Sequence, residues 1–158
     1  MFAAVSMGNL WRMARNDLQG YDVTPALDVI KMQSRSPEYS LPALEILGRM
    51  PGKDVQSYLA RIVGDPGQDL KTMRLPGVFE LNRHLQKFGV LIDKKQVDDL
   101  KRATLGAPDG TPFRAQMNVT ASMISRASAP RTGDDLRNFR PDPPAPPKEK
   151  EEKKDKDN

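Results

Sequence analysis

The sequence predicts an all-α protein, a small bundle of five to six short helices followed by a disordered tail. Apolar residues recur at spacings of three and four over much of the chain, which is the period of an amphipathic helix. Glycine and proline separate the periodic stretches, and no segment longer than Gly89–Ile92 suggests a strand. We therefore expect an N-terminal segment over residues 1–20, a helical domain over 21–127 and an unpacked tail over 128–158.

The N-terminal segment contains a short periodic stretch, Leu10 to Leu18, that includes the only tryptophan, Trp11. We interpret this stretch as a docking helix that anchors onto the protein's own core. Contact with a partner is the alternative. The next helix is expected to begin at Thr24, because threonine caps helix N-termini and Pro25 suits the first helical position.

Two further helices precede the middle of the chain. One is predicted from Ser40 to about Gly48, with a proline in its first turn. The other is predicted over Lys53–Val63, because its apolar residues follow the i, i+3, i+4, i+7 pattern and Asp54 can act as its cap. A connector is expected over Gln68–Gly77.

A pair of helices follows this connector. Apolar spacing predicts the first over Val78–Phe88, with Gly89 where a left-handed C-terminal residue is expected. The second is predicted over Lys94–Thr104, because Asp93 and Gln96 have the three-residue spacing of a capping box.

A last, shorter helix is expected over Phe113–Ile124, and the chain changes character from about Ser128. The run Pro141–Pro147 favours polyproline II, and Lys148–Asn158 mixes both signs of charge without apolar residues. Such a tail cannot bury enough apolar area to offset the entropy lost on ordering. The proline-rich run is either a stiff spacer or a docking motif, and the sequence leaves both open.

The composition excludes several classes of site. The absence of cysteine excludes disulfides, zinc–thiolate sites and thiol catalysis, and a single histidine leaves no room for a multi-histidine metal site. No apolar run approaches the roughly 20 residues of a membrane span. The N-terminus lacks the basic-then-apolar order of a secretory signal. We expect a cytoplasmic protein with no membrane partner.

Catalysis is not expected from the motifs present. His84 and Glu80 lie one helical turn apart and could pair as a base and its orienting group, but a surface ion pair or a snorkelling side chain is the favoured interpretation. No serine elbow, phosphate-binding glycine loop or carboxylate dyad with a pocket signature occurs. We therefore expect no enzyme, no catalytic residue and no cofactor.

The helix pair over residues 78–104 could also indicate a nucleic-acid function. Read as a helix-turn-helix, its second helix would direct lysines and one arginine toward DNA, but Asp98 and Asp99 lie on the same helix. The link from Phe88 to Asp93 also exceeds the usual turn. The net charge of +4 is spread along the chain, so the basic pI of 9.4 favours nucleic acid only weakly.

The order of parts over residues 78–117 resembles an EF-hand pair of the calmodulin superfamily, and the likeness extends loosely over 53–124. In that family a helix ending in Glu-Leu and an apolar turn is followed by a capped entering helix and an Asp/Gly-rich loop. The matching stretches here are Glu80-Leu81, Phe88-Gly89, Asp93–Leu100 and Ala107–Phe113. The resemblance implies a helical fold that holds a partner helix in a groove.

Both loops depart from the family pattern at the calcium ligands. With Gly110 at position 6 of the loop, Asp109 is the only carboxylate and Gln116 stands where the bidentate glutamate belongs. With Glu80 at position 12 of the earlier loop, Asp69 is at position 1 but Lys71 places a positive charge at the ion site. We therefore expect neither loop to bind calcium, and no metal site.

These observations lead us to expect a non-catalytic protein-interaction or structural module in a larger assembly, with association to the cytoskeleton as one option. The alternatives are a basic nucleic-acid-binding adaptor and a calcium sensor with atypical loops. Large apolar side chains are the candidate contacts with other proteins: Trp11, Met73, Phe79, Phe88, Phe113 and Met117.

Overall fold

The computed structural model of the chain describes residues 2–15 and 22–128. The predicted all-α class is confirmed, because these residues form helices and no strand, with seven α-helices rather than five to six. Apart from Ser128, the tail predicted over 128–158 lies outside the described residues. In chain order the elements are α1 (Phe2–Arg15), the 3-10 turn η1 (Thr24–Ala26), α2 (Leu27–Gln33), α3 (Ser40–Leu47), α4 (Lys53–Gly64), the π-helical turn η2 (Leu70–Arg74), α5 (Leu75–Phe88), α6 (Lys94–Leu105) and α7 (Pro112–Ser128).

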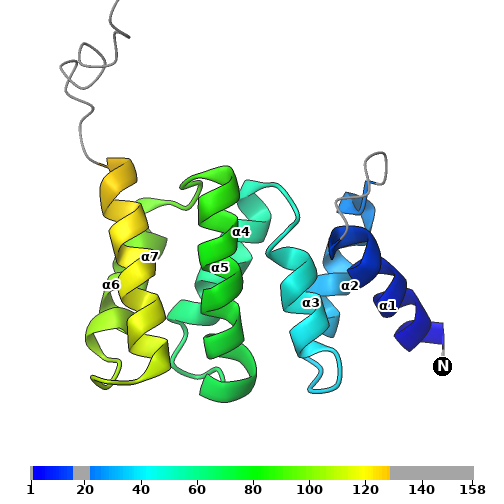
Figure 1. The fold of residues 1–158 in the computed structure, drawn as a ribbon, viewed down its shortest axis with the longest axis horizontal. Helices are drawn as coiled ribbons and strands as arrows, with labels where there is room; N and C mark the ends of the chain where they lie inside the picture. Colours follow the sequence, from blue (N-terminus) through cyan, green and yellow to red (C-terminus); the bar gives the residue numbers. More distant parts are fainter. Residues whose placement is uncertain (1, 16–21, 129–158) are drawn as a thin grey trace, which may run out of the picture.

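The helices are stacked in a row of consecutive pairs (Figure 1). Each of α2, α4 and α6 packs against the helix that follows it, and the pairs then join through α3 on α5, α5 on α7 and α4 on α6. Helices α4 and α6 thus form one layer, and α3, α5 and α7 form the other. Helix α1 packs on α3 at the N-terminal end of the row. This is the arrangement of stacked helical hairpins, in which each hairpin buries its apolar face against its neighbour.

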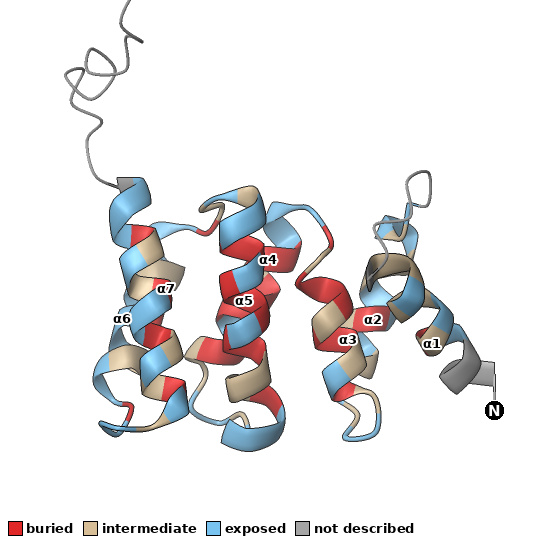
Figure 2. Ribbon diagram, viewed as in Figure 1, coloured by how far each residue is buried: buried red, intermediate tan, exposed pale blue. Residues whose placement is uncertain are grey.

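The core runs continuously between the two layers, and Figure 2 shows buried residues concentrated on α3, α4 and α5. Periodic apolar residues on each helix supply this core, as their spacing predicts. The residues with no measurable exposure include Ile30, Leu44, Ile46, Leu47, Leu59, Val63, Val78, Leu81 and Met117. Gly77 of α5 lets the backbone approach α4, since a Cβ there would lie 3.3 Å from Ile62.

The boundaries of α5 and α6 follow the predicted capping chemistry. Asp93 accepts a hydrogen bond from the Gln96 backbone N–H at 2.8 Å, and the Gln96 side chain accepts from the Asp93 N–H at 3.2 Å, which confirms the capping box. Gly89 ends α5 with φ of +73°, a conformation that residues with a Cβ rarely adopt.

Two predicted N-caps are wrong. Thr24 lies inside η1 instead of preceding it, and its backbone N–H donates to Asp22 Oδ1 at 2.9 Å. Asp54 lies in the first turn of α4, and the preceding cap position is Gly52 with φ of +120°. Both errors have the same cause, because a polar residue near a helix start suits several adjacent positions.

Three predicted ranges also change. The N-terminal helix begins at Phe2 and not at Leu10, and the predicted range beyond Arg15 lies outside the described residues. The last helix extends to Ser128. The Gln68–Gly77 connector is helical from Leu70, because the Asp69 side chain accepts the backbone N–H groups of the first turn and a π-helical turn then leads directly into α5.

Candidate partner-binding surface

The six predicted contact residues do not form one surface. Phe79 of α5 is 47% exposed, and it is the only exposed side chain of the six. Trp11 of α1 is half-buried against the core, and its indole N–H donates to the Glu45 carboxylate of α3. The docking interpretation of the N-terminal helix thus agrees with its place on α3.

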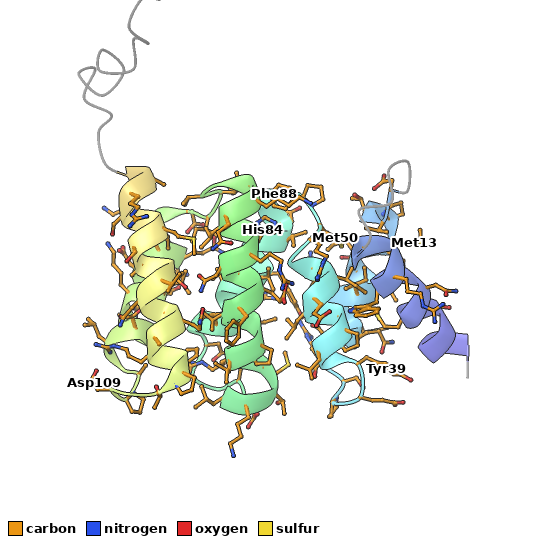
Figure 3. All side chains as sticks on the ribbon, viewed as in Figure 1. Met13, Tyr39, Met50, His84, Phe88 and Asp109 are labelled. Atoms are coloured by element: carbon orange, nitrogen blue, oxygen red, sulfur yellow. The ribbon has the colours of Figure 1, made fainter. Side chains whose placement is uncertain are left out.

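The other four predicted contacts belong to the interior. Met73, Phe113 and Met117 are at least 92% buried, so a partner could reach them only if helices separated. Phe88 is half-buried and packs its ring against His84, with ring centroids 4.6 Å apart, as Figure 3 shows near the end of α5. Large apolar residues are poor indicators of a binding surface here, because most of them serve the core.

His84 is not the surface residue that the sequence suggested. Its side chain is fully buried, and Gln56 Nε2 of α4 lies 2.9 Å from His84 Nδ1. Burial lowers the pKa of His84, because the imidazolium cation loses its hydration. Glu80 pairs with Arg83, and not with His84 as the sequence had suggested.

Gln56 uses its whole amide to hold the link between α5 and α6. Its Oε1 accepts the backbone N–H groups of Leu91 at 2.6 Å and Ile92 at 3.1 Å, and its Nε2 donates to the Gly89 carbonyl at 2.8 Å. The second Nε2 hydrogen faces His84 Nδ1, which places the histidine proton on its other nitrogen. A fully buried polar side chain is tolerated because every one of its groups is bonded.

A charged cluster lies where α5 meets the end of α3. Glu80 is 6% exposed, and Arg83 Nη1 donates to both of its carboxylate oxygens, at 2.8 and 2.5 Å. Burial raises the pKa of Glu80 to about 7, against the opposing effects of the Arg83 and Arg49 cations. Gly48 makes room for this carboxylate, since a Cβ at that position would lie 2.9 Å from the Glu80 Cβ.

The acidic side chains of the two loops compared with EF-hands have partners in the protein itself. Asp69 Oδ1 accepts from the Thr72 N–H at 2.7 Å and the Thr72 hydroxyl at 2.7 Å, and these bonds lower its pKa. Asp109, labelled in Figure 3, lies in the turn before α7, 3.7 Å from Arg114 Nη2. Among the described residues no group of three or more His, Cys, Asp or Glu side chains could hold a metal ion. The likeness to EF-hands remains a prediction.

A hollow lies along α4 and α6, and we call it the α4–α6 hollow. Its volume is about 670 Å³, within the range of ligand and peptide pockets. Small residues form much of its lining, and the two helices approach closely there, since a Cβ on Gly64 would lie 3.6 Å from the Asp99 Cβ. Its charged lining residues are Arg61, Asp65, Arg74, Asp93, Lys95, Asp99 and Arg102.

A second hollow of about 500 Å³ adjoins the first, and we call it the α4–η2 hollow. The two share Arg61 and Asp65, and the second adds Arg35 and Tyr58 to the lining. Arg61 lies over the Tyr58 ring, 5.3 Å from its centroid. Arg74 lies at the edge of the first hollow with its Nε bonded to the Val63 carbonyl at 3.0 Å.

The carboxylates of both hollows are engaged within the protein. Asp65 accepts from the Gln68 side chain at 3.0 Å and the Gly67 N–H at 2.8 Å, and these bonds lower its pKa. Asp93 caps α6, and Asp99 pairs with Arg102. We call the five cations of the two hollows, Arg35, Arg61, Arg74, Lys95 and Arg102, the basic face.

Sequence reasoning missed the basic face because its cations are far apart in the chain. They come from the turn after α2, from α4, from η2 and from α6, and only the packing of α4 on α6 brings them together. A search for a contiguous basic block could not find them. The only local signal was the two-turn spacing of Lys95 and Arg102 on one helix.

No helix in the described ranges, 2–15 and 22–128, has the length and apolar character needed to cross a membrane. Comparison of the chain with protein-family models, curated proteins and solved structures gives no match.

Proposed function

We propose that this protein is a non-catalytic helical interaction module that binds a partner protein within a larger assembly. The observation that carries the proposal is the pair of adjoining hollows on the face formed by α4, η2 and α6. Together they form a continuous, partly open surface through the shared Arg61 and Asp65. Stacked helical hairpins commonly use one long face in this way to hold a partner.

The chemistry of this face supports binding more than bond-making. Catalysis needs a base or nucleophile within hydrogen-bonding reach of a substrate. His84 and Glu80 are the buried groups with shifted pKa values, and both lie between α5 and its neighbours, away from the lining of the two hollows. The cations that do line the hollows suit recognition of charge.

The exposed ring of Phe79 supports a second contact on the other layer. At 47% exposure it is one of the large apolar side chains left uncovered on α5. A partner that wraps around the module would cover it. A single exposed aromatic residue is common on protein surfaces, so Phe79 carries less weight than the hollows.

Site-specific photo-crosslinking in the source cells tests this proposal. A photoreactive residue replaces Lys95 in the α4–α6 hollow, Phe79 on the other layer, or Arg126, an exposed residue near the end of α7 that lines neither hollow. We expect a discrete adduct with one protein from position 95, competed by the untagged full-length chain, and none from position 126.

Adducts from position 79 alone would keep an interaction function and move the surface to the α5 layer. If position 95 and position 79 both give no more adduct than position 126, the proposed function is wrong.

A further inference from the structure

We propose that the α4–α6 hollow binds an extended acidic segment of the partner, with carboxylates three residues apart. This inference rests on the proposed function and adds the chemistry of the partner. Three features of the hollow carry it: the net positive charge of its lining, the spacing of its cations along α6, and its small lining residues.

The charge balance favours an anionic occupant. Among the residues that the structure describes, four cations and three carboxylates line the hollow, so its lining carries a net charge of +1. Within the described residues Arg61 and Lys95 form no ion pair, and both are exposed. Arg102 shares one nitrogen with Asp99, which leaves further guanidinium donors for a second carboxylate. The carboxylates of an acidic segment would accept charge-assisted hydrogen bonds from these donors.

The spacing of the α6 cations sets the register of the acidic segment. Lys95 and Arg102 both line the hollow and are seven residues apart, which is two turns or about 10 Å along a helix. A polyproline II chain rises about 3.1 Å per residue with three residues per turn, so every third side chain lies on one face about 9 Å apart. Carboxylates at positions i and i+3 of such a chain would therefore face Lys95 and Arg102 together.

The hollow has small lining residues that suit an extended chain. Its lining includes Ala60, Gly64 and Ala103, whose small side chains let the backbone of an extended segment lie close to α4 and α6.

A nucleic-acid strand fits this surface less well. Phosphates and carboxylates would meet the same charged lining, so charge alone does not separate the two classes of ligand. Single strands also bind by stacking bases on exposed aromatic rings. The one ring at the basic face, Tyr58, is 6% exposed and lies beneath Lys31 and Arg61.

The test measures binding of short fluorescent peptides to the full-length chain by fluorescence anisotropy. The first peptide carries glutamate at every third position between proline and alanine residues. The second has the same composition with its glutamates contiguous, and the third replaces glutamate by lysine. A single-stranded oligothymidylate of equal length is the nucleic-acid probe. We expect the first peptide to bind most tightly and to weaken as salt is raised, because the contacts are partly exposed ion pairs.

Two matched variants locate the binding site. Lys95→Gln and Lys94→Gln remove the same charge from adjacent positions of α6, and only Lys95 lines the hollow. We expect Lys95→Gln to weaken binding of the first peptide about two- to fivefold, the range of an exposed ion pair. Lys94→Gln should leave it within the error of the wild type, and circular dichroism checks that both variants are folded.

Several results would overturn the inference: no binding of the first peptide, equal binding of the contiguous peptide, tighter binding of the oligothymidylate, or equal effects of the two lysine variants. None of these would contradict the interaction function if crosslinks from position 95 are found. Conversely, peptide binding without any crosslink in cells would support the chemistry of the hollow and contradict the proposed function.

Discussion

Burial gives the Glu80 carboxylate an unusual influence on stability. Its pKa in the folded protein is raised from 4.5 to about 7 because the buried anion loses hydration. A carboxyl group with a raised pKa binds its proton more tightly in the folded state than in the unfolded state. Its contribution is therefore complete at low pH, and stability is lost as the pH rises from about 4.5 through 7.

Glu80→Gln should remove this part of the pH dependence. A glutamine keeps the size of the side chain and does not ionise, so we expect the free energy of unfolding of the variant to fall less between pH 5 and pH 8. Over that pH range, the fall in the free energy of unfolding should differ between the wild type and the variant by at most about 3 kcal/mol. Urea unfolding at a series of pH values measures it.

Glu38→Gln is the control, since Glu38 is exposed in the turn before α3. It removes the same charge and should leave the slope as in the wild type. If the free energy of unfolding of Glu80→Gln depends on pH as that of the wild type does, burial does not shift the pKa of Glu80.

At the scale of one element, two sets of contacts fix the start of helix α6. Asp93 and Gln96 cap each other's backbone, and the Gln96 side chain also contacts Ser57 of α4 through two 3.2 Å hydrogen bonds. The capping box therefore sets where α6 begins and also docks it on the neighbouring helix. The orientation of Lys95 in the hollow depends on this arrangement.

Asp93→Ala should destabilise the protein by about 1 kcal/mol, the usual cost of losing an N-cap side chain. Thermal or urea unfolding followed by circular dichroism measures the change. Asp98→Ala is the matched control on the same helix, because Asp98 is exposed and makes only a 3.7 Å ion pair with Lys101. We expect it to cost less than about 0.5 kcal/mol. Equal costs would mean that the capping box contributes nothing specific.

The elements that the sequence predicted well are those fixed by residues close together in the chain. The range of α3, the capping box of α6 and the positive φ at Gly89 all depend on residues within a few positions of each other. The helical start at Leu70 was missed although its Asp69 cap is local. The contacts that hold the rest of η2 are distant, since Met73 is buried in the core and Arg74 bonds the Val63 carbonyl eleven positions earlier.

The candidate site was less predictable for the same physical reason. Burial of His84 depends on Gln56, 28 positions away on another helix, and no local pattern reveals that contact. Met73, Phe113 and Met117 are apolar in sequence whether they face a partner or the core. The cations of the basic face lie near one another only after the helices have packed, so the sequence does not show them as one cluster.

At the scale of the whole molecule, the row of helices implies that its ends are the weakest parts. Helix α1 packs on α3, so the loss of the Trp11 side chain, whose indole bonds to Glu45, acts on this one interface. Trp11→Ala should release α1 without unfolding the α4–α7 stack. The loss of one hydrogen bond, about 1 kcal/mol, would raise the population of the open helix about fivefold.

Limited trypsin digestion measures this opening through cleavage after Arg12, an exposed residue of α1. Cleavage there should accelerate by at least that factor, while cleavage after Arg102 in α6 keeps the wild-type rate. Val29→Ala is the control, because Val29 is 50% exposed on α2. Equal acceleration at both sites in Trp11→Ala would show that the row unfolds as one unit.

The amide of Gln56 has a consequence for how this fold can vary. Connections between helices usually tolerate insertions, because their backbone groups bond to water. In the link from Gly89 to Ile92, three backbone groups bond to one buried side chain instead. Its length is thus tied to a residue on α4, and an inserted residue would leave the Gln56 amide without partners inside the core. In related chains we would look for changes of length in the turns before α3 and α7, and for constancy in this link.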